Sequence, residues 1–188
     1  DLGGTRVGTL DSPVKIAPKW HGAAPEPRDV TVRSARGVDL RPLDVTDLKA
    51  CERLMAYVWA DENGRSRRLA EALRIARAHP PQVDKGDITH WLPAILAAPQ
   101  DEGTCRVVTH SMALQYLDGP SRAIVEEAFV SAGARATADR PLARISFEWT
   151  PARDAVHLSL TSWPSGTKRH LATCHAYGAW IDWHHTDS

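Results

Sequence analysis

Short apolar segments alternate with stretches of helical spacing through the middle of the chain, and this alternation limits the fold more than any other feature. The strand-like apolar segments cover residues 37–40, 82–85, 106–110 and 142–149. Apolar residues recur at the spacing of one helix face over residues 46–59, 62–78, 88–96 and 118–133. Strands that alternate with helices pair in parallel through right-handed crossovers. The sequence therefore predicts an α/β fold with a mostly parallel sheet.

The two ends of the chain follow other patterns. Apolar and polar residues alternate over 156–160, and a Pro-Ser-Gly turn signal follows at 164–166. We expect an antiparallel hairpin there, at one edge of the sheet. Residues 1–29 are rich in glycine and proline and lack periodicity, which predicts an irregular arm. Residues 30–188 are expected to form a single α/β domain, because one core commonly spans about 100–200 residues.

Several predicted helices have recognisable ends. Thr46 is suited to cap the first helix, and Asp118 or Ser121 the last. The second helix must end before Pro80, since proline cannot donate to the helix ladder. Gly133 is typical of a helix stop.

Composition excludes several classes of partner. The 23 lysines and arginines balance the 23 aspartates and glutamates, so no net charge attracts nucleic acid. The arginines between residues 65 and 77 are interpreted as the polar face of a helix. No apolar run approaches the ~20 residues that cross a membrane, and the 3 cysteines lack the spacing of disulfide or zinc motifs. We expect a soluble, cytoplasmic protein with a small molecule as candidate ligand.

The residues that leave each strand are the candidates for chemistry, because ligands of open α/β sheets bind beyond the carboxyl ends of the strands. Asp39 leaves the first strand and Asp87 the second, each near a glycine. A carboxylate can accept hydrogen bonds from a ribose diol, as proposed for Asp39, or from a purine amine, as proposed for Asp87. Either residue could instead cap the following helix or turn.

His110 and Ser111 leave the third strand, and Gln115 and Tyr116 follow one helical turn later. His110 is the candidate for acid–base catalysis, because imidazole titrates near neutral pH. The alternative is a histidine bonded to a backbone carbonyl. Ser111 is a candidate nucleophile, although no G-x-S-x-G motif surrounds it. Gln115 and Tyr116 are expected to line the substrate side.

Metal-binding residue types gather near the C-terminus, namely His170, Cys174, His175, His184 and His185. His170 and Cys174 would align on a helix. In the predicted strand they lie on one face but far apart along it. We therefore expect no metal site.

Three segments together resemble the later part of class I S-adenosylmethionine-dependent methyltransferases. They are Gly37–Leu40, Lys85–Ile88 and Val107–Ser111, in this order and before a closing hairpin. The resemblance implies a Rossmann-like sheet that binds S-adenosylmethionine. It also implies that Asp39 holds the ribose, that Asp87 meets the adenine, and that the exit at His110 and Ser111 faces the substrate.

A second resemblance covers nearly the whole chain and is to an uncharacterised bacterial family, domain of unknown function 2332 (DUF2332). The residues that carry it are Gly37–Asp44, Tyr57–Trp59, Arg77–Pro81, His110 and Ser111 with Gln115–Leu117, and Gly178–Trp180. The resemblance implies a longer protein, whose glycine-containing first strand would be central and would hold the methionine end of the cofactor. This chain is then expected to be its C-terminal part.

A sheet without its central strand is expected to have two unpaired edges, which is costly for backbone donors and acceptors. Neighbouring strands could close the gap, or another chain or the arm could fill it. The first hypothesis is a methyltransferase-like protein. The second is a non-catalytic α/β scaffold that pairs through an exposed edge, including with its own copy. The third is a small-molecule hydrolase that uses Ser111 and His110.

Overall fold

The computed structural model describes residues 1–184, Asn63 by its backbone alone, and divides into two compact units. The first unit consists of Asp1, Thr5–Ile16 and Pro27–Ile88. The second consists of Leu2–Gly4, Ala17–Glu26 and the chain from Thr89 onward. Both units contain helices and strands, so the predicted α/β class is confirmed.

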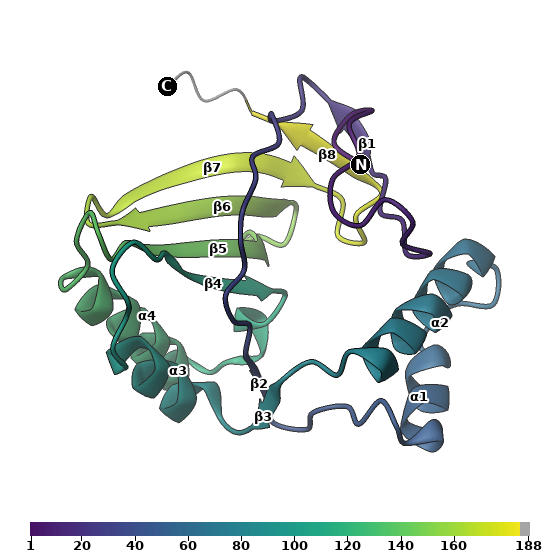
Figure 1. Ribbon diagram of the computed structural model, residues 1–188, viewed down its shortest axis with the longest axis horizontal. Helices are drawn as coiled ribbons and strands as arrows, with labels where there is room; N and C mark the ends of the chain where they lie inside the picture. The colour runs from purple at the N-terminus through teal and green to yellow at the C-terminus, as the bar shows by residue number, and fades with distance from the viewer. Residues whose placement is uncertain (185–188) are drawn as a thin grey trace. The chain divides into compact units, whose positions relative to one another are not determined.

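Two short strands form the sheet of the first unit. They are β2 (Gly37–Asp39) and β3 (Val83–Lys85), which pair in parallel (Figure 1). Asp39 at the end of β2 lies opposite Lys85 at the end of β3. The residues that leave β2 and β3 therefore lie at the same end of this sheet.

The first unit also contains two helices, α1 (Leu48–Met55) and α2 (Asn63–Ala78). Asp47 caps α1, and its carboxylate accepts a hydrogen bond of 2.9 Å from a backbone N–H of the first turn. The prediction that Thr46 caps this helix is wrong. The N–H and hydroxyl of Thr46 both donate to the carboxylate of Asp44, at 2.8 and 2.6 Å, so the helix begins after it.

The second unit is built on a six-stranded sheet with the order β1-β8-β7-β6-β5-β4 (Figure 1). Its strands are β1 (Lys19–His21), β4 (Arg106–Ser111), β5 (Leu142–Trp149), β6 (Val156–Trp163), β7 (Thr167–Cys174) and β8 (Trp180–Trp183). The parallel pairs are β4–β5 and β1–β8, and the other neighbours are antiparallel.

The larger sheet is therefore mixed, which corrects the expectation of a mostly parallel sheet. The connections over 150–155, 164–166 and 175–179 are shorter than the crossover of about a dozen residues that a parallel pair needs. Between β4 and β5 the chain forms a helix, α4 (Gly119–Gly133), and these two strands are parallel. The predicted hairpin at 164–166 is confirmed as β6 and β7, but it lies in the interior of the sheet and not at the expected edge, because β8 pairs with β7 and β5 pairs with β6.

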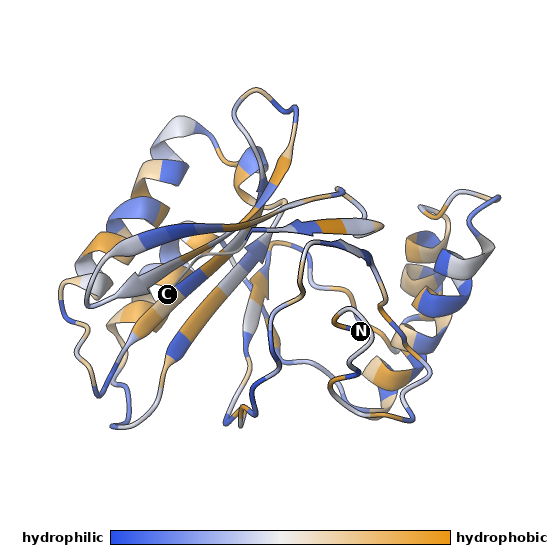
Figure 2. Ribbon diagram, turned by 90° about the horizontal axis from the view of Figure 1, so that it is seen from above, coloured by the Kyte–Doolittle hydropathy of each residue, from blue (hydrophilic) through white to orange (hydrophobic). Residues whose placement is uncertain are grey.

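α4 and α3 (Ile88–Ala97) lie beside the β4–β5 end of the larger sheet (Figure 1). Phe129 of α4 stacks on Trp163 of β6, with ring centroids 6.0 Å apart and planes 6° from parallel. Helices and strands of this unit both carry apolar stretches, which are orange in Figure 2. The buried apolar side chains here include Leu92, Leu96, Val125, Phe129 and Leu142. No helix within residues 1–184 is both long and apolar enough to cross a membrane.

Both ends of α4 agree with the sequence prediction. The Asp118 carboxylate accepts a 2.8 Å hydrogen bond from the N–H of Ser121, and Gly133 is the last helical residue. Gly133 lies against the indole of Trp163, where an added Cβ would overlap the ring. Packing, and not backbone conformation, therefore requires glycine at this position.

β4 and β1 are the two end strands of the larger sheet. β1 comes from the arm that was expected to be irregular, and its Trp20 packs against Trp183 with centroids 6.1 Å apart. Among the described strands, β4 pairs only with β5 and β2 only with β3. Neither neighbouring strands nor the arm therefore fills the predicted gap by pairing with β4.

Candidate functional site

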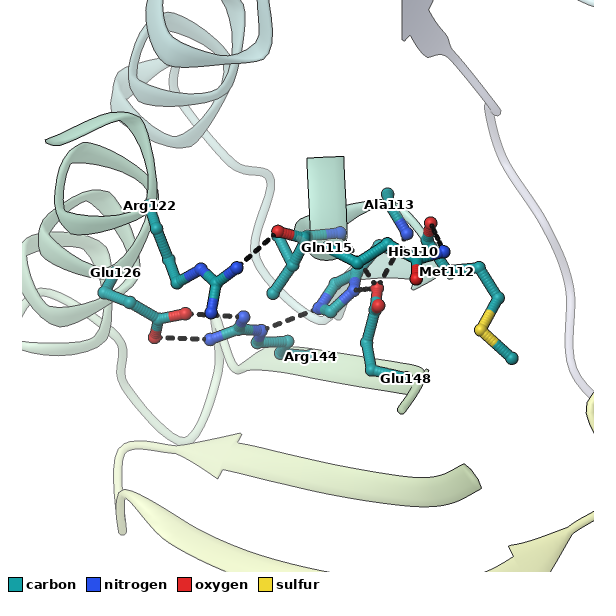
Figure 3. Close-up of polar contacts among 9 residues, drawn as sticks. His110, Met112, Ala113, Gln115, Arg122, Glu126, Arg144 and Glu148 are labelled. Carbon is teal, nitrogen blue, oxygen red and sulfur yellow. Dashed lines mark hydrogen bonds and ion pairs between the residues drawn. The ribbon is translucent and has the colours of Figure 1, made fainter. Parts of the chain in front are cut away.

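His110 is the centre of a polar network on β4, and its side chain is only 8% exposed (Figure 3). Its Nδ1 lies 2.7 Å from Oε1 of Glu148, and its Nε2 lies 3.0 Å from Nε of Arg144. A guanidinium can only donate, so Nε2 accepts from Arg144. The proton of the neutral ring must then be on Nδ1, which donates to Glu148. Both ring nitrogens are engaged.

Arg144 connects this network to α4. Its two terminal nitrogens donate to the two carboxylate oxygens of Glu126, at 2.7 and 2.8 Å (Figure 3). The guanidinium carbon lies 4.3 Å from the centroid of the Phe129 ring, and the side chain is 13% exposed. A bidentate ion pair combined with a cation–π contact holds the guanidinium in one orientation.

Glu148 of β5 fixes the loop that follows β4. Its Oε1 accepts from His110 and also from the backbone N–H groups of Ala113 and Leu114, at 3.0 and 3.4 Å. Met112, just before them, has a positive φ of 52°, which non-glycine residues rarely adopt. Such backbone positions persist only where neighbouring contacts hold them, and they gather at functional sites.

The electrostatics of the network favour an uncharged imidazole. Burial lowers the pKa of His110 below the ordinary value of 6.5, although the hydrogen bond to Glu148 opposes this. The charge of Arg144 lowers the pKa further. The hydrogen bond from Arg144 also lowers the pKa of Glu126. The network therefore combines an ion pair, Arg144 with Glu126, and a neutral histidine that accepts from the arginine.

The other residues predicted at this exit lie close to the network but take no part in its centre. Ser111 is exposed, and strand alternation directs it to the face of β4 opposite His110. Gln115 donates from Nε2 to the carbonyl of Met112 at 3.0 Å. Tyr116 ends the 3-10 helix η1 (Leu114–Tyr116) and is 82% exposed. His110 is not placed to act as a base toward Ser111.

Asp39 and Asp87 both belong to the first unit and lie at the same end of the sheet of β2 and β3. Asp39 is the last residue of β2, Asp87 stands two positions beyond the end of β3, and the N–H of Gly86 donates to the carbonyl of Asp39 at 3.0 Å. The carboxylate of Asp39 is exposed and accepts at Oδ1 from the N–H of Arg41, at 2.7 Å. Asp87 is exposed and immediately precedes α3. His110 belongs to the second unit.

Sequence reasoning missed the partners of His110. Arg144 and Glu148 stand four positions apart in β5, on one face of an otherwise largely apolar strand. Two opposite charges on one face of such a strand were the available signal. Glu126, by contrast, gives no local signal, because charged residues are common on exposed helix faces.

Three histidines of the larger sheet form a second cluster. The rings of His157 and His170 have centroids 4.0 Å apart, and those of His170 and His184 are 4.4 Å apart. Cys174 is buried in the apolar core. Within residues 1–184 no group of three or more histidines, cysteines or acids is arranged to hold a metal ion. His185 lies outside the described residues.

We predict that acid weakens the fold through His170, whose ring lies between those of His157 and His184. Burial, followed by the charge of His157, lowers the pKa of His170. A histidine with a lower pKa in the folded state binds its proton more readily when unfolded, so stability is lost as pH falls below about 6.5. Urea unfolding at about pH 7.5 and about pH 5.5 measures the loss. His170→Gln should reduce it, whereas the change His90→Gln, at an exposed position, should not.

The mixed six-stranded sheet and its helices define an α/β protein. Its candidate site is the charged network that joins β4, β5 and α4. The model of a bacterial family described as "Uncharacterized protein conserved in bacteria (DUF2332)" matches residues 1–183, and the chain belongs to this family. The predicted family membership is therefore confirmed. No curated protein and no solved structure matches the chain.

Proposed function

We propose that the chain is part of a methyltransferase-like protein with a Rossmann-like sheet, in which β2 and β3 bind the adenosine half of S-adenosylmethionine. The observation that supports this most is the parallel register of β2 and β3, with Asp39 opposite Lys85. Parallel pairing brings the exits of both strands to one end of the sheet, where α/β proteins bind nucleosides.

The chemistry of the two carboxylates fits the two halves of adenosine. Only Oδ1 of Asp39 has a partner among the described residues, so Oδ2 can accept from a ribose hydroxyl. Asp87 stands two positions beyond the end of β3 and can accept from the exocyclic amine of adenine. Gly86, between Lys85 and Asp87, carries no side chain that could cover this end of the sheet.

The loop after β4 is proposed to line the substrate side. Glu148 holds this loop in place through two backbone N–H groups, and the loop presents Gln115 and the exposed Tyr116. His110 carries no free nitrogen. It can act as a general base only if Arg144 releases Nε2, so its first role is to orient the loop.

We predict that two single substitutions weaken cofactor binding. Asp39→Asn and Asp87→Asn should each lower the affinity for S-adenosylmethionine by about tenfold, because a charged acceptor is lost. Asp61→Asn, an exposed change in the same unit, is the control. Isothermal titration of this chain, and of the longest natural form of the protein, with S-adenosylmethionine and its demethylated product gives the affinities. No heat with either ligand in either form would refute the proposal.

A scaffold that pairs through a sheet edge is the alternative proposal. It is favoured by the position of β4, a strand of six residues at the end of the larger sheet. Val107 of this strand is 50% exposed. A free edge can accept a strand of another chain, including a second copy. Light scattering separates the two proposals, since a monomer at every concentration contradicts pairing between copies.

A further inference from the structure

We propose that a basic cavity in the first unit binds a small phosphorylated molecule. The cavity has a volume of about 680 Å³ and lies between the arm and the N-terminal half of α2. The residues that carry the argument are Asp11, Lys15, Arg65, Arg67, Arg68 and Glu71. This site is independent of the proposed S-adenosylmethionine site at Asp39 and Asp87.

The charges around the cavity leave a positive excess. Arg65 is paired with Glu62 at 3.0 Å, and Glu71, which also lines the cavity, is paired with Arg74 at 2.9 Å. In each pair the two side chains stand three positions apart and neutralise each other's charge. Their charges therefore do not contribute to the excess.

Three cationic side chains that line the cavity have no acidic partner among the described residues. In the part of the chain that the structure describes, Lys15, Arg67 and Arg68 form no ion pair. Of the acids that line the cavity, Asp11 alone forms no ion pair with any described residue. Three positive charges against one negative charge leave an excess of two, which matches a phosphate monoester or diphosphate.

The types and positions of the cations favour phosphate over other anions. Guanidinium groups bind phosphate oxygens in a bidentate manner, and a lysine adds a point charge. Arg67 and Arg68 are adjacent on α2, whereas Lys15 comes from the arm. A ligand would thus be held from two sides. A cavity of this volume suits a small molecule, and the balanced charge of the whole chain gives no long-range attraction for nucleic acid.

Isothermal titration of the whole chain with inorganic pyrophosphate tests the proposal. We expect saturable binding that weakens with added sodium chloride, as charge-assisted contacts do. Arg67→Gln and Arg68→Gln should each lower the affinity by about tenfold, and Lys15→Gln by a smaller factor. Arg53→Gln removes the same charge from the exposed surface of α1, outside the cavity, and should leave the affinity unchanged.

Several results would overturn the proposal. They are the absence of saturable binding, an equal loss in Arg53→Gln, or tighter binding of a single-stranded oligonucleotide of equal charge than of pyrophosphate. Circular dichroism and thermal unfolding of each variant separate a lost ligand contact from a lost fold. If a variant is less stable than the parent chain, the conclusion rests on the variants whose unfolding is unchanged. The pyrophosphate titration and the S-adenosylmethionine titration test different sites. Failure of the phosphate proposal is therefore distinguishable from failure of the proposed function.

Discussion

Replacement of Glu148 by alanine should lower the free energy of unfolding by about 3 kcal/mol, the size expected when one partner of a buried polar pair is removed. Oε1 of Glu148 accepts from His110 and from the N–H groups of Ala113 and Leu114. All three donors would lose their acceptor, and the loop after β4 would lose its side-chain attachment to β5, while the backbone bond from Met112 to Phe147 remains. Urea unfolding monitored by tryptophan fluorescence gives the change.

Glu126→Ala is the matched control for this change. It also removes a glutamate that belongs to the network, but the side chain of Glu126 is 49% exposed, against 16% for Glu148. Water can replace part of the hydrogen bonding that Arg144 loses, so the free energy of unfolding should fall by about 1 kcal/mol. Equal losses for the two variants would show that burial of Glu148 does not control the stability of the loop.

Gly133→Ala should destabilise the protein by about 2 kcal/mol, although alanine is the better helix former. An added Cβ would overlap atoms of the Trp163 indole, which is itself stacked on Phe129. The ring cannot move away without breaking that stack. Thermal and urea unfolding measure the loss, and near-ultraviolet circular dichroism reports the environment of the indole.

Gly119→Ala provides the comparison within the same helix. An added Cβ at Gly119, the first residue of α4, meets no atom within 4 Å. Its effect should lie within about 0.5 kcal/mol of zero. A stable Gly133→Ala variant with an unchanged tryptophan signal would contradict the close packing of α4 on β6.

The positions of the helices were predictable because helix signals are local. Asp118 and Gly133 mark the ends of α4, and the two prolines after α2 stop it. Thr46 was the wrong cap because Asp44, two positions earlier, competes for its hydrogen-bond donors. Sequence pattern predicts the type of residue that caps a helix. Which of two neighbouring candidates becomes the cap depends on competing local hydrogen bonds.

The order of the strands was less predictable, because pairing joins distant parts of the chain. β1 pairs with β8, although the arm that contains β1 has no strand pattern of its own. The candidate site was only partly predictable, because its residues also come from distant parts of the chain. His110 is found from its position near the end of an apolar strand. Arg144 of β5 donates to it, and Glu126 of α4 accepts from Arg144. Only the assembled sheet brings these groups within bonding distance.

The pairing of β1 with β8 has a consequence for any attempt to dissect the chain. Neither unit is a continuous piece of sequence, because Ala17–Glu26 belongs to the second unit while the segments on both sides of it belong to the first. A fragment that starts at residue 30 would lose the Trp20–Trp183 contact and expose the backbone of β8. Recombinant pieces should therefore keep residues 17–26, even though their sequence looks like a dispensable tail.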